Sequence, residues 1–132
     1  SAEVALHEMF VVYMDQTYVR PNRHFGKDES LHILEGEADF YFFDLSGNVT
    51  DVISLGAAET GKRFYIRVPK EVYHTIVMKS ETLVIHEVTP GPFVRSDTEW
   101  ATWAPDENAT ADAAKFLDTL RNIAAPLGNP EY

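Results

Sequence analysis

The residues best suited to chemistry in this 132-residue chain are two histidines and one glutamate that lie beside turn-forming residues. If the run that ends at His24 is a strand, Asn22 and His24 share one of its faces. Residues 25–28 include a glycine and can turn the chain back, so that Glu29 opens a neighbouring strand. His74 begins a later strand after a proline turn. Imidazole and carboxylate groups move protons or hold metal ions, and without cysteine a metal can use only these groups, amides and backbone oxygen.

The elements that must position these residues have strand character. Eight short runs rich in β-branched or aromatic residues alternate with turn signals and have no helix between them. A Ser-Gly-Asn sequence at 46–48 fits a hairpin turn. The predicted strands are Met9–Met14, Thr17–Arg20, Leu31–Leu34, Ala38–Phe43, Val49–Ser54, Phe64–Val68, Thr75–Met78 and Leu83–Val88. This pattern predicts an all-β antiparallel sandwich or barrel.

The chain changes character after the last predicted strand. Trp100 and Trp103 lie in an irregular segment, and we expect both to dock a helix that follows. Asn108 or Thr110 can cap this helix and Pro126 ends it. Its predicted apolar face comprises Ala113, Phe116, Leu117, Leu120 and Ile123.

The first group of chemical residues resembles a motif of the cupin superfamily. That motif has His-x-His, three or four residues, Glu, six residues and Gly. It is matched here at His24, Glu29 and Gly36, with Asn22 in place of its first histidine. The spacing is long and specific, so the match carries weight despite the departure.

The second group resembles the other cupin motif, Pro-x-Gly-x-x-His. Pro69 and His74 match it, and Glu71 stands where the glycine would be. The resemblance implies a double-stranded β-helix, which is a small jelly-roll barrel, with the C-terminal helix packed outside it. It also implies that His24, Glu29 and His74 bind one divalent metal ion inside the barrel.

Asn22 leaves three alternatives for the fourth ligand position. Its amide oxygen coordinates the metal, or it holds a metal-bound water, or it only lines the pocket. The remaining two-His-one-carboxylate set suits Fe(II) with open positions or Zn(II) with a bound water, and Ni(II) or Mn(II) also fits. A barrel that has lost its metal is the alternative without a cofactor.

A narrower likeness is to the WbuC family of cupin-fold metalloproteins, and it runs from about residue 6 to 107. It implies a link to bacterial surface-polysaccharide genes and so to O-antigen or nucleotide-sugar chemistry. The segments that carry it are Tyr18–His24, Phe42–Asn48, Val68–Thr75, His86–Phe93 and Trp103–Glu107.

Three further residues are candidates for catalysis. His86 and Glu87 are adjacent on one strand, so only one of them faces the lumen, and the resemblance favours Glu87. Glu87 is then an acid or base, or a partner of an imidazole, and a salt-bridged carboxylate is the equal alternative. His7 matches a recurrent family position near the pocket mouth. Tyr18 offers a hydroxyl.

Arg20, Arg67 and Tyr73 are the candidates for substrate binding. Either guanidinium could clamp a carboxylate or phosphate, although a surface role is as plausible for each. Tyr73 could supply a pocket hydroxyl. His32 lies between Leu31 and Ile33, so we expect it to face away from the lumen and not to bind metal.

Composition limits the partners. The net charge of −10 argues against nucleic acid, whose phosphates require clustered Lys and Arg. No run approaches the roughly 20 apolar residues that span a bilayer. We expect one domain over residues 1–132, with the barrel at about 5–95 and the C-terminal segment and helix at about 96–132. We also expect a cytoplasmic protein that binds a small molecule, with no membrane partner, and that forms a homodimer because short strands leave edges to cover.

Three functions are consistent with these observations. The first is a metal-dependent isomerase, epimerase or lyase that acts on a sugar or sugar-derived acid, with the metal as Lewis acid and Glu87 or a metal-bound water moving the proton. The second is a non-haem Fe(II) dioxygenase. The third is a non-catalytic module that binds metal or sugar.

Overall fold

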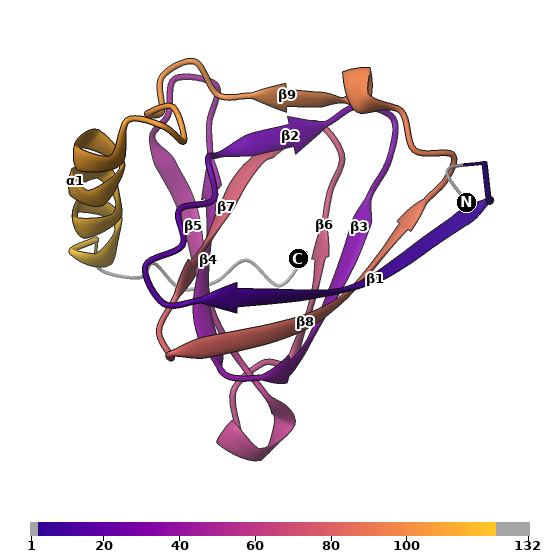
Figure 1. Cartoon of the computed structure of the whole chain (residues 1–132), viewed down its shortest axis with the longest axis horizontal. Coiled ribbons are helices and arrows are strands. Elements are labelled where there is room, and N and C mark those ends of the chain that lie inside the picture. The colour runs from indigo at the N-terminus through magenta and orange to yellow at the C-terminus, as the bar shows by residue number, and fades with distance from the viewer. Residues whose placement is uncertain (1–2, 124–132) are drawn as a thin grey trace.

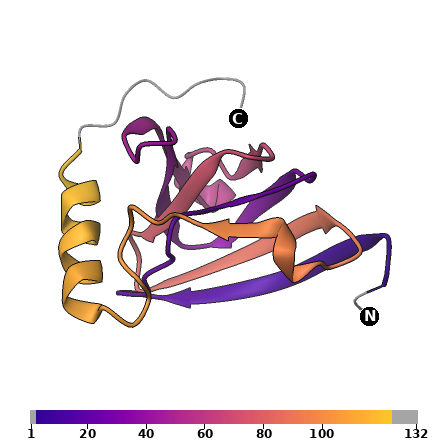
Figure 2. The same cartoon turned by 90° about the horizontal axis from the view of Figure 1, so that it is seen from above.

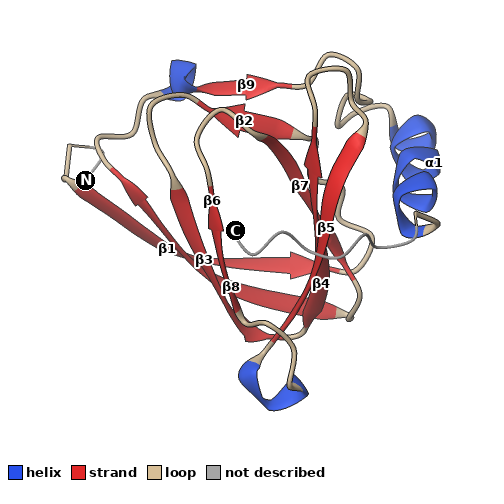
Figure 3. Cartoon of the chain, turned by 180° about the vertical axis from the view of Figure 1, so that it is seen from behind, coloured by secondary structure: helices blue, strands red, loops and turns tan. Residues whose placement is uncertain are grey.

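The computed structural model describes residues 3–123, and in it two antiparallel sheets face each other (Figures 1 and 3). One sheet has four strands in the order β1-β8-β3-β6, and the other has five in the order β5-β4-β7-β2-β9. The elements are β1 Leu6–Met14, β2 Asn22–His24, β3 Glu29–Glu35, β4 Glu37–Phe43, β5 Val49–Gly56, β6 Tyr65–Val68, β7 Tyr73–Met78, β8 Thr82–Pro90, β9 Thr98–Trp100, the 3-10 helices Ala58–Thr60 and Arg95–Asp97, and α1 Thr110–Arg121. This architecture confirms the predicted all-β jelly-roll barrel of the cupin type with one helix outside it.

Alternation along the strands builds the interior. On β3, Leu31 and Ile33 are buried, whereas Ser30 and His32 are partly exposed on the other face. Burial of an aliphatic or aromatic side chain contributes roughly 1.5–3 kcal/mol, so the buried side chains of this layer stabilise the barrel. The core between the sheets includes Leu31, Ile33, Phe40, Phe42, Ile53, Leu55, Ile66, Val68, Ile76, Met78, Leu83 and Ile85.

The outer side of the five-stranded sheet is covered by α1 (Figures 1 and 2). Leu117 and Leu120 of the helix pack with Tyr41 and Tyr73 of the sheet. The Tyr41 hydroxyl also donates a hydrogen bond to the Leu120 carbonyl at 3.0 Å. All five residues of the predicted apolar helix face belong to this region or are buried: Ala113, Phe116, Leu117, Leu120 and Ile123.

The predicted helix caps were wrong. The residue before α1 is Ala109, and no side chain caps the helix. Instead, the Asp106 carboxylate accepts the backbone N–H of Asn108 at 2.9 Å and closes the turn before the helix. The helix ends at Arg121, and the predicted stop, Pro126, lies outside the described residues.

Two predictions about strands were also wrong. Thr17–Arg20 forms no strand, because a turn at Gln16 leads into an extended loop whose Val19 carbonyl accepts the Thr75 hydroxyl at 2.5 Å. Residues 98–100, predicted as irregular, form β9, which pairs with β2 through Asn22 and Trp100. A pairing between segments so far apart in the chain leaves no local pattern in the sequence.

The two motif turns differ in how they meet the need for a left-handed backbone. Gly36 has φ 87°, and a Cβ there would collide with the Thr82 carbonyl oxygen, so glycine is required. Glu71 occupies the glycine position of the second motif and has φ 65°. Its N–H donates to the His24 carbonyl at 2.7 Å, which ties this turn to the strand of the first motif.

Candidate metal centre

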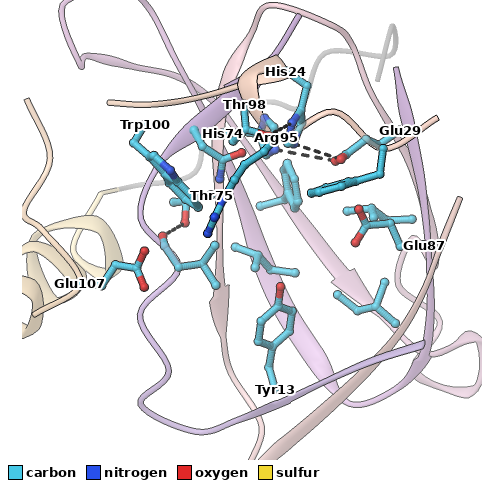
Figure 4. A pocket seen from close by; sticks show the side chains of 17 residues that line it. Tyr13, His24, Glu29, His74, Thr75, Glu87, Arg95, Thr98, Trp100 and Glu107 are labelled. Atoms are coloured by element: carbon cyan, nitrogen blue, oxygen red, sulfur yellow. Dashed lines mark hydrogen bonds and ion pairs between the residues drawn. The ribbon is translucent and has the colours of Figure 1, made fainter. Parts of the chain in front are cut away.

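His24, Glu29 and His74 converge at one point, with one potential ligand atom from each within 4.8 Å of the others. His24 Nε2 lies 3.0 Å from Glu29 Oε1, and His74 Nε2 lies 3.9 Å from Glu29 Oε2 (Figure 4). All three side chains are largely buried. Two imidazole nitrogens and a carboxylate at this separation could hold a metal ion.

The barrel assembles this group from both sheets. His24 ends β2, and His74 lies on the adjacent β7, where its register partner is Asn22. Glu29 opens β3 in the opposite sheet, next to Val68 of β6. The site therefore depends on the closure of the two sheets at this end of the barrel.

Hydrogen bonds at the far nitrogens orient both imidazoles. His74 Nδ1 is 2.9 Å from the Val72 carbonyl, which can only accept, so Nδ1 donates and Nε2 keeps its lone pair toward Glu29. His24 Nδ1 is 2.9 Å from the Thr98 hydroxyl. Such partners fix the ring and its tautomer in metal-binding histidines, so this donor set fits a divalent ion.

The charges in the group are coupled. Burial alone raises the pKa of Glu29, but the His24 hydrogen bond and the charges of His24 and His74 outweigh it, and the net pKa is lowered. Burial lowers the pKa of His74, against the opposing effect of Glu29. An anionic carboxylate beside neutral imidazoles is the protonation state that binds metal.

Glu87 of β8 faces the same cavity as the three candidate ligands (Figure 4). Burial raises its pKa to about 8, and the charge of Glu29 and a hydrogen bond with it act in the same direction. Its neighbour His86 points to the outside, where its ring stacks on Phe10 and lies 3.4 Å from Glu8. The strand alternation predicted from sequence therefore holds for this pair.

The cavity has a volume of about 460 Å³, which is enough for a small organic molecule. Leu31, Phe40 and Ile85 of the core form an apolar part of its wall. The polar and aromatic residues in its lining are Tyr13, Asn22, His24, Glu29, His74, Thr75, Glu87, Phe93, Arg95, Thr98, Trp100 and Glu107.

Asn22 is buried in the cavity wall. Its Nδ2 donates to the Arg20 carbonyl at 3.0 Å, so the amide nitrogen is engaged with the backbone. The amide oxygen is then the atom that can accept a bond or coordinate. All three roles considered for Asn22 remain available to that oxygen.

Three of the predicted site residues lie outside the cavity lining, in contacts with the C-terminal segment. The Tyr18 hydroxyl donates to the Pro105 carbonyl at 2.8 Å. Arg20 donates to the Ala101 carbonyl through Nε and Nη2 and pairs with Asp106 at 3.3 Å. Tyr73 packs in the outer cluster because it precedes His74 by one residue and so points to the opposite face of β7.

His7 and Arg67 also lie outside the cavity lining. His7 sits on β1 with its ring 6.3 Å from that of Phe93, and its buried Nε2 has no hydrogen-bond partner. Arg67 lies on the outer face of β6, in a separate surface hollow with Lys27 and Lys70. His32 faces outward toward Phe64, as the sequence predicted.

Several residues of the cavity lining were not predicted from the sequence. Tyr13 could have been found from strand alternation, because it shares its face with other inward residues of β1. Thr75 could not, because alternation places it on the face of β7 opposite His74, where its hydroxyl donates to the Val19 carbonyl. Burial raises the pKa of Tyr13, and the charges of Glu87 and Glu29 add to the effect.

The positions of Arg95 and Trp100 in the cavity could not have been predicted from local sequence patterns. Trp100 was predicted to dock the helix, but it lines the cavity, and only Trp103 packs against Phe43, Tyr73 and Phe116. Figure 4 shows the Arg95 side chain extending among the cavity residues. Within residues 3–123, its guanidinium has no hydrogen bond or ion pair.

Comparison with known proteins supports the fold. A family model described as "Domain of unknown function (DUF6016)" matches residues 1–55. No curated protein sequence matches the chain. Among solved structures, a dTDP sugar isomerase from Desulfovibrio desulfuricans G20 is similar with a TM-score of 0.63 and 14% identity over 78% of this chain and 66% of that one.

Two further structures are similar at the same level. Protein SO0799 from Shewanella oneidensis has a TM-score of 0.62 and 15% identity over 95% of this chain and 78% of its own. The capsular polysaccharide assembling protein CapF from Staphylococcus aureus has a TM-score of 0.59 and 15% identity over 74% of this chain and 29% of its own. The chain thus spans less than two thirds of the isomerase and less than a third of CapF. At these identities the matches establish the fold alone.

Among the described residues, no helix is both long enough and apolar enough to cross a membrane.

Proposed function

We propose that this protein is a metal-dependent enzyme of the isomerase, epimerase or lyase type that acts on a sugar or sugar-derived substrate. The observation that carries the proposal is the convergence of His24, Glu29 and His74 on a cavity that also contains Glu87. The names of two structural neighbours, a dTDP sugar isomerase and a capsular polysaccharide assembling protein, support a role in surface-polysaccharide metabolism.

His24, Glu29 and His74 would hold the ion, which is Fe, Zn, Ni or Mn, with Asn22 beside them. When bound, a divalent ion supplies Lewis-acid polarisation of a carbonyl or enediolate oxygen. The hydrogen bond that His74 donates to the Val72 carbonyl, and the one between His24 and the Thr98 hydroxyl, would keep the two imidazoles in place.

The remaining cavity residues have complementary roles. Glu87 would accept or return the proton at a carbon next to the polarised carbonyl, because it faces the cavity from β8 opposite the histidines. Arg95, whose guanidinium is unpaired within the described chain, would bind an anionic group of the substrate, a carboxylate or phosphate. Phe93 and Trp100 would cover an apolar face of the sugar.

Elemental analysis of the purified full chain tests the metal centre. We expect about one divalent ion per chain in the parent protein and its loss in His74→Ala. His32→Ala is the matched control, because this imidazole lies on the outer face and should leave the metal content unchanged. A parent protein without metal after reconstitution with each of the four ions would overturn the proposal.

Solvent exchange tests the reaction. In D₂O, keto-sugar nucleotides that are substrates should gain deuterium at the carbon next to the carbonyl, as followed by NMR. Glu87→Gln should stop the exchange while the metal content stays unchanged. An exchange rate that Glu87→Gln leaves intact would remove Glu87 from the proton transfer.

A non-haem Fe(II) dioxygenase is the second candidate, because the two-His-one-carboxylate set is the ligand set of such enzymes. Iron in anaerobically purified protein, with substrate-dependent oxygen consumption, would favour it over the isomerase. A metal-loaded protein with neither activity would leave the third hypothesis, a non-catalytic binding module. The narrower WbuC likeness and the cytoplasmic location remain predictions.

A further inference from the structure

A surface hollow on the outer side of the four-stranded sheet collects basic side chains. It has a volume of about 380 Å³ and lies at one end of β3, β6 and β8, beside the loops that join the two sheets. Three of its lining residues are basic: Lys27, Arg67 and Lys70. The whole chain has 11 basic and 21 acidic residues, so three cations in one hollow reverse the overall charge locally.

The protein does not neutralise these three cations. Within residues 3–123, none of their side chains has an ion pair or a hydrogen bond, and the Lys27 ammonium lies 5.7 Å from the centroid of the Phe93 ring. Other basic side chains in the same part of the chain are paired with carboxylates, namely those of Arg20, Arg23, Lys62, Lys79 and Arg121. The hollow therefore keeps positive charge available for a ligand.

The floor of the hollow adds a hydroxyl group. Ser30 of β3 pairs with Arg67 of β6 on one side and with Val88 of β8 on the other. Because Ser30 follows Glu29, its side chain points to the outer face of β3, away from the candidate metal ligands. Its hydroxyl has no hydrogen-bond partner within residues 3–123. Paired residues on one face have Cβ atoms about 5 Å apart, so Ser30 and Arg67 can bind the same ligand.

The backbone that carries the two lysines is held in place before any ligand binds. Asp28 Oδ1 accepts the Lys70 N–H at 2.8 Å. The Thr89 hydroxyl donates to the Asp28 carbonyl at 3.1 Å. These bonds tie the loop that contains Lys27 to the turn that contains Lys70 and to the end of β8. A ligand in the hollow therefore does not have to order these loops, which reduces the entropy cost of binding.

The charge and the surface of the hollow indicate the class of ligand. The Asp28 carboxylate offsets one of the three cations, whereas the Glu29 carboxylate is turned toward His24 in the lumen. Two positive charges therefore remain to be balanced. A phosphate monoester is a dianion above its second pKa of about 6 and balances both, whereas a single carboxylate balances one. The hollow also has an apolar side, formed by Leu6, Val88 and Pro90.

We propose that this hollow binds a small organic phosphate monoester at a site separate from the metal cavity. The Arg67 guanidinium holds two phosphate oxygens with its parallel N–H donors, and the Ser30 hydroxyl donates to the phosphate from below. Lys27 and Lys70 neutralise the remaining charge, and the organic part of the ester lies against the apolar side. Because Glu29 and Ser30 face opposite ways on β3, the metal centre and this site lie back to back on one strand and can be occupied together.

Calorimetric titration of the full chain with phenyl phosphate at about pH 7.5 tests the site. We expect one site per chain with a dissociation constant below about 1 mM. Arg67→Gln should weaken the binding at least about tenfold, because it removes charge-assisted hydrogen bonds. Lys115→Gln is the matched control, because it removes the same charge from an exposed position on α1, outside the other sheet. Benzoate, which carries one charge, should bind at least about tenfold more weakly than phenyl phosphate.

NMR signals of the backbone amides and of the indoles test where the ligand lies. Phenyl phosphate should shift the amide signals of Ser30, Arg67 and Lys70. Trp100 lines the metal cavity, so its indole signal reports on a ligand bound there and should stay in place. Arg95→Gln removes a cation from the cavity lining and should leave the affinity for phenyl phosphate unchanged.

A parent chain that does not bind phenyl phosphate at millimolar concentration would overturn the proposal. So would equal weakening in Arg67→Gln and Lys115→Gln, because net charge alone would then attract the anion. Loss of binding in Arg95→Gln, with a shift of the Trp100 indole signal, would place the phosphate in the metal cavity instead. None of these outcomes depends on a bound metal, so the test is independent of the proposed function.

Discussion

The outer faces of the two sheets differ in how far their side chains are buried. On the five-stranded sheet, Tyr41 and Tyr73 are buried beneath α1 and the segment that contains Trp103. On the four-stranded sheet, Phe10 and Tyr65 remain 71% and 46% exposed. Both outer faces are rich in apolar residues, but residues 3–123 cover only one of them.

This difference explains why residue type was a poor guide to the site. Tyr18, Arg20 and Tyr73 have suitable chemistry, but each is engaged in holding the C-terminal segment on the covered face. The cavity is built from the inner faces, where His24, His74 and Glu87 point. Polar residues near a motif therefore serve the site only if their strand face points inward.

The largest expected effect comes from opening the covered face. Leu117→Ala removes a buried side chain between α1 and the sheet and should lower the free energy of unfolding by about 2–4 kcal/mol. Val12→Ala, on the uncovered side, should change the stability of the monomer by less than about 0.5 kcal/mol. Urea denaturation at low protein concentration measures both. Equal losses would show that the two faces do not differ as described.

The two arginines predicted to bind substrate offer the next comparison. Arg20→Met removes charge-assisted bonds to Ala101 and Asp106 and should cost about 1.5–3 kcal/mol. Arg67→Met, on the exposed outer face of β6, should change stability by less than about 0.5 kcal/mol. Thermal denaturation measures the difference, and metal content should stay constant in both. A loss of metal in Arg20→Met would contradict the structural role.

A smaller effect concerns the Tyr41 hydroxyl. Tyr41→Phe removes its bond to the Leu120 carbonyl and should cost about 1 kcal/mol at pH 7. Burial raises the pKa of Tyr41 to about 12, above its ordinary value of 10.0. A raised folded-state pKa gives stability that is complete below pH 10 and is lost as the pH rises through 12.

Urea midpoints between pH 9 and pH 12 test this dependence. The parent protein should lose stability over that range, and Tyr41→Phe should lose less. The decline should not vanish, because Tyr18 also has a pKa raised to about 12 by burial. Parallel curves for the two proteins would argue against ionisation of Tyr41 as a cause.

The smallest effect lies where the two sheets join, at the turn between β6 and β7. Glu71 holds a left-handed backbone that costs a non-glycine residue about 1–2 kcal/mol, and glycine loses about 0.5–1 kcal/mol in chain entropy. Glu71→Gly should therefore stabilise the fold by about 0.5–1 kcal/mol. Glu71→Ala keeps the Cβ and is the matched control, with little change in the midpoint of thermal unfolding. A destabilised glycine variant would mean that the carboxylate has a role of its own.

Local patterns predicted much of the barrel and the centre of the site. The alternation in β3, β4 and β7 and the apolar face of α1 follow from burial on one side of a regular element. The spacing of His24, Glu29 and Gly36 identified two of the candidate ligands, but the expectation that Glu29 opens a strand beside that of His24 was wrong, because residues 25–28 carry the chain from β2 to the opposite sheet. β9 and the places of Arg95 and Trp100 could not be predicted, because they arise from a pairing with β2 that joins distant segments.

The sequence by itself determined which residue types were available and how neighbouring ones alternate, because strand geometry fixes the facing of adjacent side chains. Together with the resemblance to the cupin motifs, that was enough to propose His24, Glu29 and His74 and to favour Glu87 over His86. Only the tertiary structure decided which face of each element turned inward, because that depends on sheet closure and on the docking of α1. It separated Tyr73 from the cavity and brought Arg95 to it, and it left β1 at the edge of the four-stranded sheet in the described part of the chain.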